Sequence, residues 1–164
     1  MPRESLQTLY EHELTDLYSA ETQIIEALPK LIKAATNPAL KAALTEHLAI
    51  TETQLGRLDQ IFEALGKKPE SEKCKGMEGL LKEGDKAIEE HKDSDVQDAA
   101  IIGATQRVEH YEMAGYGCAR TYAAMLGLTK QSEILQTTLN EEGEADHRLT
   151  DLAEECVNLE AMKV

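Results

Sequence analysis

VEHYEMAGY, at residues 108–116, decides how the chain folds, because it places two acids on the buried side of a helix. At about 100° per residue, Glu112 falls in the middle of an apolar stripe and Glu109 lies about 60° to one side. The apolar positions of this stripe are Ile101, Val108, Tyr116, Ala119, Ala123 and Leu126. An ionised carboxylate in a protein core costs several kcal/mol unless a cation meets it. We therefore expect a positive charge or a metal ion opposite these two glutamates.

The composition is that of a single helical domain, residues 1–164. The chain has no Trp and only 4% aromatic residues, and it is rich in Ala, Leu, Glu and Lys, which favour helices. Its formal net charge of −14 at pH 7 makes nucleic acid and anionic membranes poor partners, since both bind basic surfaces. No apolar run reaches the roughly 18 residues of a membrane span, and the N-terminus has no apolar signal-peptide region. We expect a cytoplasmic protein.

The three cysteines, Cys74, Cys118 and Cys156, are odd in number and far apart. Their spacing indicates neither a disulfide framework nor a Cys-x-x-Cys metal site. We expect reduced thiols.

Apolar periodicity predicts four long helices, at residues 4–35, 38–65, 94–126 and 130–159. Pro29 interrupts the first helix and predicts a kink, and Ser94 is a candidate N-cap for the third. Residues 66–93 form a long crossover that contains a short amphipathic helix at 77–91. Two helical hairpins joined by such a crossover predict an all-α fold, a four-helix bundle of the ferritin-like type.

Acids also occupy the inward faces of the first and fourth helices. The fourth helix has Glu142 at the centre of its apolar stripe, with Asp146 about 40° away, and the first has Glu21 near the centre of its own. Folding the chain back between the third and fourth helices brings Glu142 and Asp146 to the level of Glu109 and Glu112. We expect these acids to meet in one layer.

The second helix offers two alternative ligands, His47 and Glu52. Folding the first hairpin sets Glu52 level with Glu21, but Glu52 lies at the edge of the apolar stripe. His47 points inward, about one turn away from that level. Both residues therefore remain candidates.

Acids gathered at one level repel one another and retain protons unless cations lie between them. Carboxylate oxygens with one or two imidazoles suit iron or manganese, and paired helical hairpins can hold two such ions. A single inward Glu is more often an ion-paired or snorkelling side chain, but five at one level favour a dinuclear metal site. The candidate ligands are Glu21, His47, Glu52, Glu109, Glu112, Glu142 and Asp146.

A second acid and histidine motif, Glu144-x-x-His147, matches the Glu-x-x-His pattern of dimetal proteins. On the helical wheel both residues lie about 140° to 160° from Glu142, and His110 lies about 160° from Glu112. We expect these three side chains at the surface or at a subunit interface.

Five segments, taken together, are characteristic of one protein family. They are DLYSAE (16–21), His47-Leu48 with Thr51 and Gln54, CKGMEGL (74–80), VEHYE (108–112) and LTDLA (149–153). In these segments the chain resembles the YciF/YciE family of bacterial stress proteins within the ferritin-like superfamily. The resemblance covers nearly the whole chain and implies a cytoplasmic, stress-associated homodimer. The pair Glu109-x-x-Glu112 is also similar to the third-helix pattern of rubrerythrin-like di-iron proteins, which implies terminal and bridging carboxylates there.

The chain departs from the rubrerythrin-like pattern in its second and fourth helices. Those proteins have Glu-x-x-His in both, whereas here the second helix lacks the motif and the fourth offers Glu142 and Asp146 in its place. A site so rich in carboxylates should bind metal more loosely and favour its more oxidised state.

Two functions follow from these expectations. In the first, two iron or manganese ions react with peroxide or oxygen, and Tyr18, Tyr111 or Tyr116 donates hydrogen bonds or electrons. In the second, the protein is not catalytic, and its site stabilises the helices or stays empty with shared protons. Iron storage is a third interpretation, but the chain shows no recognisable interface for a ferritin cage. The sequence therefore fits both an enzyme of the di-iron oxidase or peroxidase type and a protein without catalytic activity.

Overall fold

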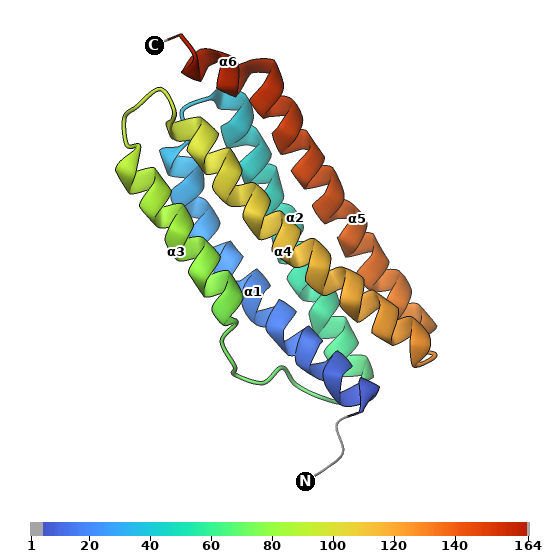
Figure 1. The fold of residues 1–164 in the computed structure, drawn as a ribbon. Coiled ribbons are helices and arrows are strands. Elements are labelled where there is room, and N and C mark those ends of the chain that lie inside the picture. The colour runs from blue at the N-terminus through green and yellow to red at the C-terminus, as the bar shows by residue number, and fades with distance from the viewer. Residues whose placement is uncertain (1–4, 164) are drawn as a thin grey trace.

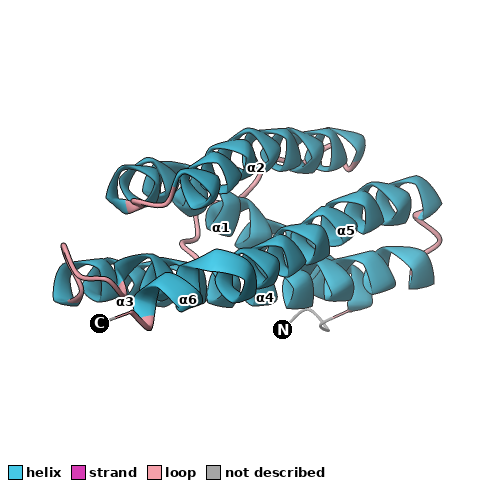
Figure 2. Ribbon diagram, turned by 90° about the horizontal axis from the view of Figure 1, so that it is seen from above, coloured by secondary structure: helices cyan, strands magenta, loops and turns pink. Residues whose placement is uncertain are grey.

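The computed structural model describes residues 5–163, and its regular structure is helical. The helices are α1 (Leu6–Ala34), α2 (Pro38–Ala64), α3 (Lys75–Glu90), α4 (Gln97–Met125), α5 (Thr129–Leu152) and α6 (Asn158–Ala161), with a π-helical turn at Ala153–Val157 (Figure 1). Residues 5–163 contain no strand (Figure 2), which confirms the predicted all-α class. Among these helices, none combines the length and the apolar character that a membrane span requires.

The four long helices pack as two hairpins. α1 packs against α2, and α4 packs against α5, while α3 lies alongside α1 and α4 on the outside (Figure 1). α1 and α4 also contact each other, whereas α2 and α5 pack less closely than the helices of either hairpin. This arrangement surrounds one interior with side chains from all four long helices.

Local chemistry places the ends of these helices. Before Pro38, the side chain of Asn37 accepts hydrogen bonds from the backbone N–H groups of Ala39 and Leu40 at 2.9 and 3.1 Å, as an N-cap should. A glycine with positive φ lies two residues after the end of α2 and of α4, with φ of 65° at Gly66 and 76° at Gly127. Glycine adopts this left-handed conformation without the steric cost of a Cβ atom, so the chain can reverse sharply there.

The start of α4 differs from the prediction. Ser94 is not its N-cap, because the hydroxyl of Ser94 donates to the carbonyl of His91 at 2.6 Å. α4 begins at Gln97, after Val96, which makes no side-chain cap bond. The chain is still turning after α3 at this point, with Asp93 at a φ of 58°. The helix predicted at 130–159 is likewise interrupted by the π-helical turn.

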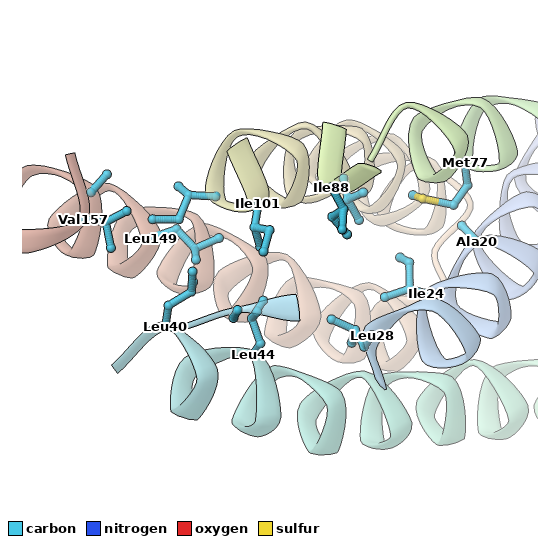
Figure 3. Packing of buried hydrophobic residues seen from close by; sticks show 14 of the residues in the cluster. Ala20, Ile24, Leu28, Leu40, Leu44, Met77, Ile88, Ile101, Leu149 and Val157 are labelled. Atoms are coloured by element: carbon cyan, nitrogen blue, oxygen red, sulfur yellow. The ribbon is translucent and has the colours of Figure 1, made fainter. Parts of the chain in front are cut away.

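Two apolar clusters fill the interior on either side of a polar layer. The first includes Ala20, Ile24, Leu28, Leu44, Ile101, Val108 and Leu149 (Figure 3). The second includes Leu14, Leu17, Leu58, Tyr116, Ala119 and Leu135. Along α4 the first cluster ends at Val108 and the second begins at Tyr116, and along α5 the boundary falls between Leu135 and Leu149. The buried acids of both helices occupy these intervals.

Candidate metal centre

Five buried side chains from the four long helices form the polar layer. Glu21 comes from α1, His47 from α2, Glu109 and Glu112 from α4, and Glu142 from α5. Each of the four glutamates is 0% exposed, and His47 is 6% exposed. Because glutamates are almost never fully buried unless they are paired, this layer requires a chemical explanation.

The closest grouping in the layer consists of one imidazole and three carboxylates. One possible ligand atom from each of His47, Glu109, Glu112 and Glu142 lies within 4.8 Å of the other three. Nε2 of His47 is 2.9 Å from Oε1 of Glu109. Carboxylate oxygens with an imidazole nitrogen form a donor set that suits iron or manganese.

Glu21 adds a fourth carboxylate beside this group. The hydroxyl of Tyr116 donates a hydrogen bond to Oε1 of Glu21. Tyr116 and Glu112 are four residues apart on α4, so their side chains share one face of that helix. The tyrosine therefore holds the α1 carboxylate against the face of α4 that carries the other acids.

Most oxygens of this layer lack hydrogen-bond donors. Within residues 5–163, no donor reaches Oε2 of Glu21 or either oxygen of Glu112 and Glu142. Nε2 of His47 lies close to Oε1 of Glu109 without forming a hydrogen bond, and Nδ1 of His47 has no partner in the same range. Unpaired buried carboxylates are costly when ionised. These atoms therefore fit a site that takes up cations or retains protons.

Burial raises the pKa of every glutamate in the layer. Loss of hydration, followed by the charge of Glu142, raises the pKa of Glu21 to about 8. Loss of hydration also raises the pKa of Glu109 to about 7. The pKa values of Glu112 and Glu142 rise well above 4.5, because burial is reinforced by repulsion from neighbouring carboxylates. Without a cation, the layer therefore holds protons at neutral pH.

Helix phase separates the two candidates on α2. The buried face of α2 includes His47, Thr51, Gln54 and Leu58, whereas Glu52 is exposed and lies outside the cluster. Glu52 follows Thr51 directly, so its side chain points about 100° away from that face. The position of Glu52 along the helix matches that of Glu21, but the direction of its side chain depends on helix phase, which turns it away from the site.

Asp146 lies at the edge of the site, outside the closest grouping. Its side chain is 20% exposed, and its Oδ2 is 3.2 Å from Nε2 of His110. His110 is 65% exposed, which confirms that this histidine is a surface residue. Asp146 still influences the centre, because its charge contributes to the raised pKa of Glu109.

The alternative motif on α5 lies on the surface, as predicted. Glu144 is exposed, and His147 is 79% exposed with its Nε2 3.8 Å from Oδ2 of Asp151. Neither residue belongs to the buried grouping.

A cavity of about 160 Å³ lies between α2, α4 and α5. Its lining includes His47 and Glu109 from the cluster, and Glu46, Glu141, Glu144 and Arg148 from the rim. This cavity was not predicted from the sequence. The sequence feature that could have indicated its charged lining is the spacing of Glu141, Glu144 and Arg148 at i, i+3 and i+7, which puts these residues on one face of a helix.

The three tyrosines proposed as donors have different environments. Tyr116 contacts the cluster through Glu21. Tyr111 donates to Oδ2 of Asp16 at 2.7 Å and lies 3.1 Å from Sγ of Cys74. Tyr18 packs edge-on against Phe62, with ring centroids 5.9 Å apart. Only Tyr116 is therefore placed to act on the buried acids.

The sequence profile described as "Domain of unknown function (DUF892)" matches residues 5–162. Protein YciF of Escherichia coli strain K12 is 43% identical to the chain over 162 residues, which cover 98% of each protein.

Two solved structures are similar over almost the full length. The crystal structure of the E. coli stress protein YciF has a TM-score of 0.90 at 43% identity, covering 95% of this chain and 99% of that one. YcfI of Rhodopseudomonas palustris, provisionally described as a structural protein, has a TM-score of 0.87 at 44% identity, covering 92% of this chain and 97% of that one. These likenesses show that the same all-helical fold is shared.

Proposed function

The chain belongs to the DUF892 family, and we propose that it is a metal-binding stress protein whose four long helices form a ferritin-like bundle around two iron or manganese ions. The observation that carries this proposal is the buried group of His47, Glu109, Glu112 and Glu142, whose ligand atoms lie within 4.8 Å of one another. Similarity to the stress protein YciF supports the stress role.

The proposed ligands divide between the closest grouping and its neighbours. His47, Glu109, Glu112 and Glu142 are the inner ligands, and Glu21 is the further carboxylate that allows a second ion. Asp146 is kept as an outer acid, because it is partly exposed and lies close to His110. The metal ions, when bound, would supply open coordination positions for peroxide or oxygen.

The chain's own residues prepare this centre in two ways. The apolar clusters on both sides keep bulk water away from the layer along the helices, so the charges of the glutamates act strongly on one another and on a bound cation. The hydroxyl of Tyr116 holds Glu21 through a hydrogen bond, a contact that orients a ligand from outside the metal site.

Metal content per chain tests the proposal directly. After anaerobic loading with Fe²⁺ and desalting, we expect about two ions per wild-type chain and loss of both in Glu112→Gln/Glu142→Gln. The matched control is Glu144→Gln/His147→Gln, which removes the surface motif and should retain the wild-type content. Equal metal content in wild type and Glu112→Gln/Glu142→Gln would refute the buried site.

A non-catalytic role is the second candidate, and the provisional description of YcfI as a structural protein favours it. In that case metal raises the melting temperature but the loaded protein does not consume peroxide. Consumption that is lost in Glu112→Gln, with helicity retained, would instead favour an oxidase or peroxidase.

We also propose that the protein is a cytoplasmic homodimer. Light scattering should give twice the chain mass. A large shell holding many iron atoms per chain would instead indicate storage.

A further inference from the structure

The cavity between α2 and α5 joins the proposed ligands to the protein surface. Its floor contains His47 and Glu109, and its rim contains Glu46, Glu144 and Arg148. The side chains of Glu46 and Arg148 are 57% and 50% exposed, and Glu144 is exposed as well. The volume of about 160 Å³ is large enough for several water molecules. Solvent therefore has a polar path toward the buried acids between α2 and α5.

One residue of the cavity floor, His47, has a buried nitrogen that lacks a partner. The side chain of His47 is 7% exposed, and its Nδ1 has no hydrogen-bond partner within residues 5–163. Buried polar atoms are normally paired. A water molecule or an ion beside His47 would satisfy this nitrogen, and the adjacent carboxylate of Glu109 favours a cation.

The three rim acids differ in their ion pairs. Glu46 pairs with Arg148 across the rim. Glu141 accepts two hydrogen bonds from Arg57, at 2.6 and 2.8 Å. Glu144 forms no ion pair with any residue of the part of the chain that the structure describes. Glu144 is therefore the rim carboxylate that is free to meet an arriving cation.

We propose that divalent cations reach the buried site through this cavity, with Glu144 as their first ligand and the ion pair between Glu46 and Arg148 as the barrier across the rim. The inference rests on the proposed metal site. A cation that loses its hydration shell needs oxygen or nitrogen ligands along its path, and this lining supplies them. A second cavity that touches His47 and Glu109 measures about 30 Å³ and is lined mainly by apolar side chains.

Stopped-flow uptake of Co²⁺ by the metal-free protein tests the route. Glu144→Gln removes one rim charge at constant size, and we expect uptake to slow about three- to tenfold at low salt, with unchanged final Co²⁺ content. Arg148→Gln breaks the ion pair and should speed uptake about threefold or more. Glu133→Gln is the matched control, because Glu133 is exposed on the same helix but does not line the cavity.

The possible results distinguish a failure of the proposed entry route from a failure of the proposed metal site. A wild-type uptake rate in Glu144→Gln, with wild-type final content, would overturn the route and leave the site intact. Equal slowing in Glu133→Gln would also overturn it, because the effect would then be one of net charge. Failure of the wild-type protein to retain Co²⁺ would overturn the proposed site and the route with it. A difference between Glu144→Gln and wild type that shrinks in about 0.5 M salt would support steering by the rim charge.

Discussion

At the scale of single residues, the hydroxyl of Tyr116 influences the protonation of a buried glutamate. Tyr116 is 1% exposed, and its hydroxyl donates to Glu21. Burial raises the pKa of Glu21, and this hydrogen bond opposes the rise by stabilising the ionised carboxylate. The tyrosine therefore makes it easier for Glu21 to lose its proton and act as a ligand.

Tyr116→Phe should destabilise the metal-free protein more at high pH than at low pH. A hydrogen bond to a charged group contributes about 1.5–3 kcal/mol, whereas one to a neutral group contributes about 1 kcal/mol. We expect a loss of about 2 kcal/mol at pH 9 and about 1 kcal/mol at pH 5, measured by urea unfolding. Tyr122→Phe, at a partly exposed position of α4, should change stability by less than about 0.5 kcal/mol. Equal losses for Tyr116→Phe at both pH values would contradict the contact with an ionisable partner.

At the scale of the elements, the packing of α3 against α4 requires a residue without a side chain at position 76. A Cβ atom at Gly76 would lie 2.6 Å from Cε2 of Tyr111. The ring of Tyr111 cannot easily move away, because its hydroxyl is bonded to Asp16 and lies near Cys74. The first turn of α3 can therefore approach α4 only with glycine at this position.

Gly76→Ala should consequently lower the free energy of unfolding by about 1–3 kcal/mol, as overpacking does. Gly79→Ala is the matched comparison on the same helix, since a Cβ atom there meets nothing within 4 Å. That substitution should raise the free energy of unfolding by about 0.5–1 kcal/mol, because alanine favours a helix over glycine. Urea titration measures both variants. A stabilising Gly76→Ala would show that α3 does not pack against Tyr111 as described.

Helix phase was predictable only where the apolar stripe was clear. Glu112 and Glu142 stand between strongly apolar positions of α4 and α5, and both side chains are buried, as the periodicity predicted. On α2 the buried face also carries His47, Thr51 and Gln54, so its apolar stripe is ambiguous and does not separate the exposed Glu52 from the buried His47. Polar residues inside a core weaken the apolar periodicity from which burial is inferred.

The cavity and the start of α4 could not be predicted for a different reason. The cavity depends on how closely α2 and α5 pack, and these helices are not neighbours in sequence. Ser94 had the right chemistry for an N-cap, but its hydroxyl bonds to His91 in the preceding turn. Distances between elements and competition between local hydrogen bonds appear only in the folded chain.

For the whole molecule, the buried layer links stability to pH. An acid whose pKa is higher in the folded chain than in the unfolded chain binds its proton more tightly when folded, so stability falls as pH rises through the folded pKa. The pKa rises from 4.5 to about 7 for Glu109 and to about 8 for Glu21. Glu141, whose pKa is lowered beside Arg57, loses its contribution only in acid. Between pH 5 and 8 the change in stability therefore comes from the buried layer, with a further contribution from Glu13, whose pKa is also raised by burial.

The metal-free protein should have its highest melting temperature near pH 5 and lose stability toward pH 8. One pKa unit corresponds to about 1.4 kcal/mol, so the shift of Glu109 alone corresponds to about 3 kcal/mol, and the melting temperature should fall by about 10 °C. Circular dichroism of chelator-treated protein measures this fall. Glu112→Gln/Glu142→Gln should flatten the pH dependence, because it removes two of the buried acids whose pKa is raised. Excess Mn²⁺ should abolish the fall in wild type but not in this double variant, since only a cation held among the acids can replace their protons. A wild-type melting temperature that is constant from pH 5 to 8 without metal would mean that these carboxylates are not buried together.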